Sequence, residues 1–108
     1  MISALLALML AAPSPDALAS ARKEYNRCLT AYMKTSVDKK ADEAAYESGL
    51  SGACGAKESA FRNASIAVDS AAGIRRASAE ENADLEIKDM RTNSVELFKD
   101  WAKGAAPE

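Results

Sequence analysis

No proline interrupts the sequence between Pro15 and Pro107. Proline breaks helices more strongly than any other residue, so this long segment is free to be helical over most of its length. The segment is also rich in alanine, glutamate, lysine and arginine, which are good helix formers. No run within it alternates apolar and polar residues over the length of a strand. The sequence therefore predicts an all-α protein.

Apolar side chains recur at intervals of three and four residues in three stretches, which we expect to be helices over 20–37, 42–72 and 78–104. The stripe of the first stretch consists of Tyr25, Cys28, Leu29 and Tyr32, with Met33 beside it. The stripe of the second stretch consists of Tyr46, Leu50, Cys54, Phe61, Ala64 and Val68. The stripe of the third stretch consists of Ala83, Ile87, Met90, Ser94, Leu97 and Trp101.

Residues typical of helix ends flank these stretches. Gly73 stands where a glycine commonly ends a helix. The segment from Ser78 to Glu81 has the spacing of a capping box, in which the serine and the glutamate each satisfy a free backbone amide. Lys103 and Gly104 are expected to close the third helix, and residues 105–108 to form a frayed tail.

The chain is long enough for one domain, which we place at residues 20–104. Three amphipathic helices with short links predict an antiparallel three-helix bundle, or an elongated helical hairpin with a third helix. Much of the apolar content is alanine, which buries little surface per residue. The core is therefore thin, and a domain of this size commonly needs a covalent cross-link or a partner as well.

The first twelve residues include a continuous apolar run, 2–12, that ends at Pro13. The run is too short to span a membrane but has the length of the apolar region of a secretory signal. Small residues follow at the spacing that a signal peptidase requires, although no lysine or arginine precedes the run. We interpret residues 1–19 as a signal peptide cut before Ser20 or Arg22, which predicts a periplasmic or secreted protein. The alternative is an apolar N-terminal helix packed on the domain.

Two cysteines, Cys28 and Cys54, lie on the stripes of the first two helices. The midpoint between them is Ala41, in a polar segment where the chain is expected to bend. A bend there places both cysteines at the same height across a helical hairpin, and an oxidising compartment would let them pair. The sequence therefore predicts a Cys28–Cys54 disulfide.

Three glycines surround Cys54, at Gly49, Gly52 and Gly55. They are interpreted as part of a small-residue face that lets the first helix approach closely. The alternative is a turn at 49–55, which would place Cys28 far from Cys54 and forbid the disulfide.

The composition argues against several function classes. The chain has no histidine, so it cannot alone form a serine or cysteine triad that depends on one. Its net charge of −2 comes from mixed acids and bases without a basic block, which disfavours nucleic-acid binding. We therefore expect a non-enzymatic protein without a cofactor. Glu80 and Asp84 lie one helical turn apart and are weak candidates for a cation site, although acids in a first turn are common.

Two groups of aromatic and apolar residues are candidate binding residues. Tyr25 and Tyr32 share one face and are possible ligand-facing residues, although aromatics at helical spacing are commonly core. We expect Leu97, Phe98 and Trp101 to close one end of the bundle or, if Phe98 and Trp101 are both exposed, to form a docking surface for a protein partner. The leading hypothesis is an exported interaction or structural module that binds another protein or itself. The alternative is a bundle that binds a small ligand or a cation.

Overall fold

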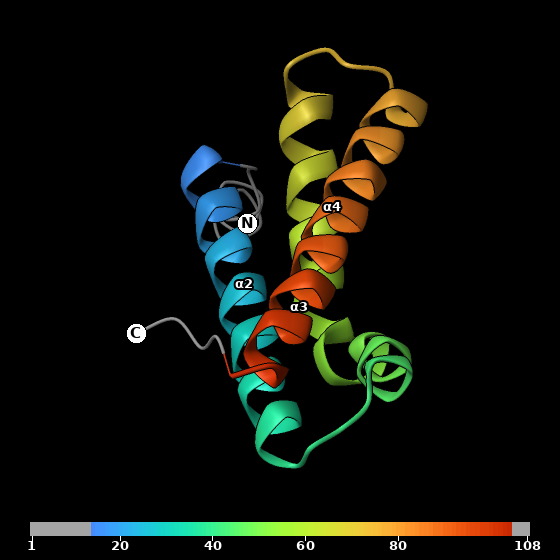
Figure 1. Cartoon of the computed structure of the whole chain (residues 1–108). Helices are drawn as coiled ribbons and strands as arrows, with labels where there is room; N and C mark the ends of the chain where they lie inside the picture. The colour runs from blue at the N-terminus through green and yellow to red at the C-terminus, as the bar shows by residue number, and fades with distance from the viewer. Residues whose placement is uncertain (1–13, 105–108) are drawn as a thin grey trace.

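The computed structural model describes residues 14–104, and these form three α-helices in an up-down-up arrangement (Figure 1). The helices are α2 (Pro15–Asp38), α3 (Glu43–Ala71) and α4 (Arg76–Ala102). The predicted all-α three-helix bundle is confirmed. Residues 1–13, which include most of the predicted signal peptide, and the predicted frayed tail 105–108 lie outside the described residues. None of the described helices is long and apolar enough to cross a bilayer.

Helix α2 begins at Pro15, earlier than the predicted start at Ser20. Ser14 caps the helix by accepting a hydrogen bond from the backbone amide of Ala17 at 3.1 Å. Proline is well suited to the first helical position, because its missing N–H needs no partner there. The added turn matters for packing, since Leu18 lies against the core.

The chain turns between α2 and α3 where the sequence predicted, around Ala41. Asp42 caps α3 by accepting a hydrogen bond from the amide of Ala45 at 2.8 Å. Helix α3 then continues without interruption through the three glycines, so the alternative turn at 49–55 is wrong. Its end at Gly73 is as predicted, with the glycine in the left-handed region at φ 89°.

Helix α4 begins at Arg76, and the predicted capping box at Ser78 is wrong. The link after α3 is short, so helical hydrogen bonding resumes earlier than expected: the amide of Ala79 already donates to the carbonyl of Arg75 at 2.9 Å. The start of α4 has no side-chain cap. Ser78 therefore lies inside the first turn and does not cap the helix. At the other end, Gly104 closes the helix at φ 90°, as predicted.

The predicted disulfide between Cys28 and Cys54 is present, with the two Cα atoms 5.9 Å apart. It joins α2 to α3 near their middle. Gly49 permits a second close contact between the same helices, because a Cβ there would overlap the Tyr32 hydroxyl. That hydroxyl donates to the backbone carbonyl of Tyr46 at 3.2 Å. Gly52 and Gly55 have no neighbour within 4 Å of such a Cβ, so the small-residue face is confirmed only at Gly49.

The main core lies between all three helices and is dominated by aromatic rings. The ring of Tyr46 stacks between Phe98, at 4.3 Å, and Tyr32, at 5.0 Å between ring centroids. A smaller second cluster lies nearer the α3–α4 loop and consists of Ile66, Ala79 and Ala83. The buried residues of the main core are Tyr25, Leu29, Met33, Tyr46, Leu50, Cys54, Phe61, Ile87 and Phe98.

Candidate functional site

The seam between α3 and α4, which we call the paired seam, contains a hollow of about 730 Å³. Its apolar floor is formed by Leu50, Ile87 and Val95. The remaining lining residues are charged or polar: Glu43, Glu47, Glu58, Arg62, Asp84, Lys88, Arg91, Thr92, Glu96 and Lys99.

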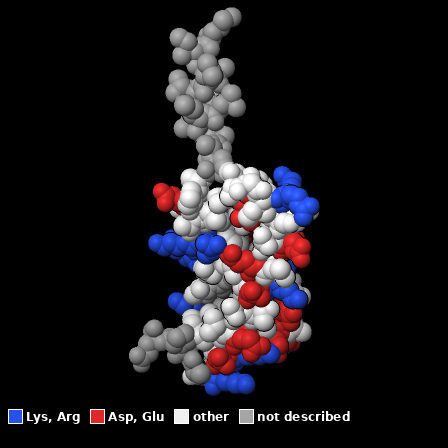
Figure 2. Space-filling model, turned by 90° about the horizontal axis from the view of Figure 1, so that it is seen from above, with Lys and Arg blue, Asp and Glu red and all other residues white. Residues whose placement is uncertain are grey.

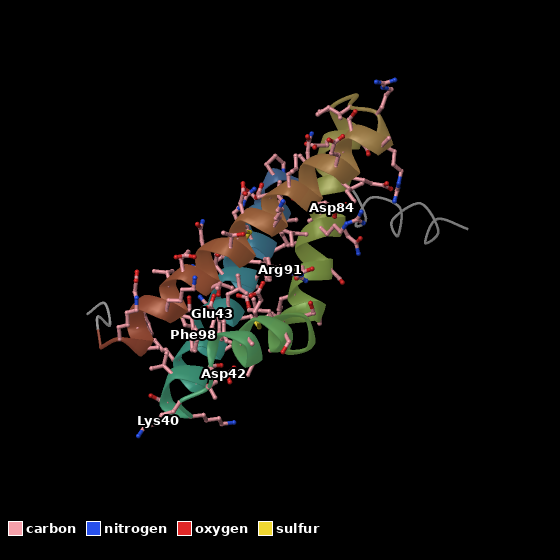
Figure 3. All side chains as sticks on the ribbon, turned by 45° about the vertical axis from the view of Figure 1, so that its right-hand side comes forward. Lys40, Asp42, Glu43, Asp84, Arg91 and Phe98 are labelled. Carbon is pink, nitrogen blue, oxygen red and sulfur yellow. A yellow bond between two sulfur atoms is a disulfide. The ribbon has the colours of Figure 1, made fainter. Side chains whose placement is uncertain are left out.

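Three ion pairs cross the paired seam, one near each end and one at its middle. Asp84, Arg91 and Glu43 follow one another along it in Figure 3. Arg62 pairs with Asp84 at 2.8 Å, Arg91 with Glu58 at 2.6 Å, and Lys99 with Glu43 at 3.1 Å. The charges that line this hollow are therefore largely neutralised by the chain itself.

The middle pair extends into the core through Tyr25. Arg91 donates to both carboxylate oxygens of Glu58, and the buried Tyr25 hydroxyl donates to the same carboxylate at 3.0 Å. Burial raises the pKa of Tyr25 to about 12, although the neighbouring Arg91 opposes the shift. The ring of Tyr25 packs on Phe61, with ring centroids 6.0 Å apart. Tyr25 is thus fully buried, and Tyr32 is half-buried against Tyr46.

The acidic candidates for a cation site, Glu80 and Asp84, each bind an arginine. Glu80 accepts from Arg76 at 3.0 Å, one turn away. Asp84 accepts from Arg62, and this hydrogen bond lowers the pKa of the Asp84 carboxyl. Across residues 14–104 no group of three or more carboxylate or cysteine side chains is arranged to hold a metal ion. The structure does not bring Glu80 and Asp84 together with a third ligand.

The seam between α2 and α4, which we call the open seam, is organised differently. One ion pair crosses it, Arg22 with Glu86 at 3.0 Å, toward the end of the bundle where α2 begins. Further along lies a slot of about 110 Å³. Among the described residues no side-chain hydrogen bond links the two helices along this slot. It is lined by Asn26, Leu29, Thr30 and Met33 of α2 and by Met90, Asn93, Ser94 and Leu97 of α4.

The three candidate docking residues at the end of α4 have different environments. Phe98 is only 2% exposed and packs on Tyr46, so it is not available to a partner. Leu97 is 46% exposed at the edge of the open slot. Trp101 is half-buried, and the Lys34 ammonium lies 5.9 Å from its ring centroid. Of the three, Leu97 presents the most accessible apolar surface.

The buried face of α4 differs from the predicted one, so that Phe98 rather than Leu97 enters the core. The predicted stripe of α4 placed Leu97 on the core face, but the buried positions are Ala79, Ala83, Ile87, Ser94 and Phe98. Ser94 is tolerated at a buried position because its hydroxyl forms a hydrogen bond with that of Tyr46. Phe98 follows Ser94 by one turn, which turns Leu97 toward α2 and solvent.

Sequence reasoning missed Glu58 and Arg91, and it missed the polar residues of the open slot, Asn26, Thr30 and Asn93. None of these belongs to a motif. A signal existed only for Asn26 and Thr30, which lie one turn apart beside the predicted α2 stripe. Comparisons with protein-family models, with curated proteins and with solved structures find no match to this chain.

Proposed function

We propose that this protein is an exported, non-enzymatic interaction module that binds a macromolecular partner at the open seam. The observation that carries the proposal is the slot between α2 and α4, where Leu97 stands exposed above an apolar floor of Leu29, Met33 and Met90. Asn26, Thr30 and Asn93 surround it with amide and hydroxyl groups. An apolar anchor surrounded by such groups is typical of the centre of a protein interface.

The contrast with the paired seam supports this choice of surface. A partner at the paired seam would have to break the ion pairs that line it, or else bury charged groups that are already paired and so contribute no new contact to binding. The slot of the open seam offers exposed polar groups and an exposed leucine. A partner that fills the slot therefore removes apolar surface from water without displacing an existing contact.

The assignment to an exported protein rests on two features. The apolar run 2–12 has the character of a secretory signal, and the Cys28–Cys54 disulfide is typical of an oxidising compartment. A cut before Ser20 removes the Ser14 cap and Leu18 and shortens α2 by its first turn. The intact mass of protein recovered from its native cells tests both features. We expect a mass that begins at Ser20 or Arg22 and is two hydrogens light, whereas a full-length mass with two titratable thiols contradicts export.

The docking surface is tested by photo-crosslinking in the native cells. A photoreactive amino acid at Asn93 reports on the open seam, and the same amino acid at Thr92 reports on the paired seam as a matched control, because both positions are exposed on α4. We expect a discrete crosslinked product from position 93, lost on Leu97→Asp, and none from position 92. Equal products from both positions, or none from position 93, would contradict the proposal.

A second candidate function is the binding of a small ligand in the paired seam, because its hollow has the volume of a small-molecule site and an apolar floor. The two functions differ in what stabilises the protein. A ligand in the hollow raises the melting temperature, and the substitution Ile87→Ala on the floor abolishes that rise. Binding of a macromolecule at the open seam predicts no such response to small molecules.

A further inference from the structure

The exposed face of α2 beside the open slot carries three basic residues, Lys23, Arg27 and Lys34. They lie at positions that share one face of the helix, and all three are exposed. Together with Asn26, Thr30 and Ala31 they line a shallow hollow of about 420 Å³. We call this face the basic strip. In Figure 2 basic side chains project from the left-hand edge, the side on which α2 lies in Figure 1.

The positive charge of the basic strip is only weakly compensated. Arg27 pairs with Glu24 at 3.2 Å, but both side chains are well exposed and Lys57 shares the same carboxylate. The Lys34 ammonium lies over the Trp101 ring, and among the described residues neither Lys23 nor Lys34 forms an ion pair. On the opposite side of the molecule, Figure 2 shows acidic and basic side chains interspersed.

The basic strip and the open slot form one continuous surface, because Asn26 and Thr30 line both hollows. A ligand on the strip can therefore place an apolar side chain in the slot beside Leu97. On this basis, and resting on the docking function proposed above, we infer that the partner presents a short acidic peptide segment with an apolar residue. Its carboxylates bind Lys23, Arg27 and Lys34, and its apolar side chain fills the slot.

The length of the strip fits a short peptide. Lys23 and Lys34 are eleven positions apart, which corresponds to about 16 Å along a helix. An extended peptide covers that distance with about five residues. Beyond the strip on the same face, toward the C-terminal end of α2, stands Asp38, so a ligand that continued past Lys34 would meet a carboxylate.

The small number of cations and the acidic residue Asp38 distinguish a peptide from a long polyanion as ligand. A nucleic acid or an anionic polysaccharide would extend beyond the three cations, gain no further charge contacts, and be repelled where it passes Asp38. A membrane is also a poor match, because a flat surface of lipid headgroups cannot fill a slot between two helices. The slot accepts one protruding side chain, which a peptide supplies.

The test uses the oxidised full chain and a blocked five-residue peptide with a leucine between two pairs of acidic residues. Binding is followed by amide chemical shifts. We expect shifts at Asn26, Thr30 and Asn93, and a loss of affinity of about tenfold in the double variant Lys23→Glu, Lys34→Glu, which corresponds to about 1.4 kcal/mol. The control double variant Lys39→Glu, Lys88→Glu has the same net charge and is expected to retain most of the affinity. Replacing the leucine of the peptide with serine should also weaken binding.

Several outcomes overturn the inference. They are shifts at the paired seam, equal loss in both double variants, or tighter binding of phosphatidylglycerol vesicles or polyphosphate at the strip. Self-association through this face, seen by sedimentation, overturns it as well, because the occupant would then be a second copy. A further outcome is that crosslinking at position 93 traps a partner equally well in the double variant Lys23→Glu, Lys34→Glu. In that case the docking function stands and the acidic-peptide inference fails.

Discussion

Helix α4 forms two seams, one with α3 and one with α2, and the two differ in how they are closed. On the α3 side, ion pairs close the seam at Asp84, Arg91 and Lys99, and the Tyr46–Phe98 stack lies beneath them. On the α2 side, the two helices are joined by Arg22–Glu86 and by the contact of Lys34 with Trp101, with a slot between. Helix α2 is fixed mainly to α3, through the disulfide and the Tyr32–Gly49 contact. Both α2 and α4 are therefore held in place mainly by their contacts with α3. The side of the bundle between α2 and α4 is left available for binding.

The largest expected effect comes from removing the disulfide. The substitution pair Cys28→Ser, Cys54→Ser should lower the free energy of unfolding by about 3 kcal/mol, because the cross-link closes a loop of 26 residues in the unfolded chain. If α2 depends on α3 for its attachment, amide exchange should accelerate most in α2. Chemical denaturation and hydrogen exchange measure the two effects. Equal acceleration of amide exchange in α4 would show that the disulfide does not attach α2 in particular.

Removing the central carboxylate of the paired seam should cost less. Glu58→Gln leaves Arg91 and Tyr25 with a weaker acceptor, and we expect a loss of about 2–3 kcal/mol, since hydrogen bonds to charged groups contribute most. The matched control on the open seam is Glu86→Gln, whose pair with Arg22 is well exposed and contributes less than about 1 kcal/mol. Urea denaturation of both variants gives the difference in the free energy of unfolding. Similar losses would mean that the ion pairs of the two seams contribute equally to stability.

Tyr25 links α2 to the paired seam, and its raised pKa predicts a loss of stability at alkaline pH. The folded state holds the phenol proton to about pH 12, whereas the unfolded chain releases it near pH 10. The unfolded state therefore binds fewer protons in this window, and stability falls as the pH rises from 10 to 12, by about 2 kcal/mol. Tyr25→Phe should flatten this decline in denaturation curves recorded across the window. A decline of unchanged size would assign it to another group, such as Tyr46, whose pKa is also raised by burial.

A pair of glycine substitutions tests the contact between α2 and α3 at Gly49. Gly52→Ala meets open space and should stabilise the helix by about 1 kcal/mol. Gly49→Ala gains the same helical propensity but displaces the Tyr32 hydroxyl from its carbonyl partner, which offsets the gain by about 1 kcal/mol. The two variants should therefore differ by about 1 kcal/mol in thermal unfolding, and an equal gain would show that Tyr32 does not fix this approach.

The smallest effect on stability is expected at the open seam itself. Leu97→Ser removes a half-exposed side chain and should change the free energy of unfolding by less than about 0.5 kcal/mol. The same substitution should nevertheless remove the crosslinked product from position 93. A stability loss above about 2 kcal/mol would show instead that Leu97 is part of the core.

Local features of this protein were accessible from the sequence. The proline-free segment, the bend near Ala41, the helix end at Gly73 and the pairing of Cys28 with Cys54 all follow from residues close in sequence or from equal spacing about a bend. The failures were also local in origin: Ser14 began α2 early, and Ser78 did not cap α4. The Ser14 side chain caps α2 ahead of the expected start, and in α4 helical hydrogen bonding already begins at the carbonyl of Arg75, before the capping box.

The sequence by itself determined three helices, their order and the cross-link, because helix propensity, capping and apolar periodicity act over one or two turns. Only the tertiary structure decided which charges meet across α3 and α4, that Phe98 rather than Leu97 enters the core, and that a slot remains beside α2. Each residue turns a helix by about 100°, so a shift of one position moves a side chain from core to surface. That rotation is set by packing between helices, which no single stretch of sequence contains.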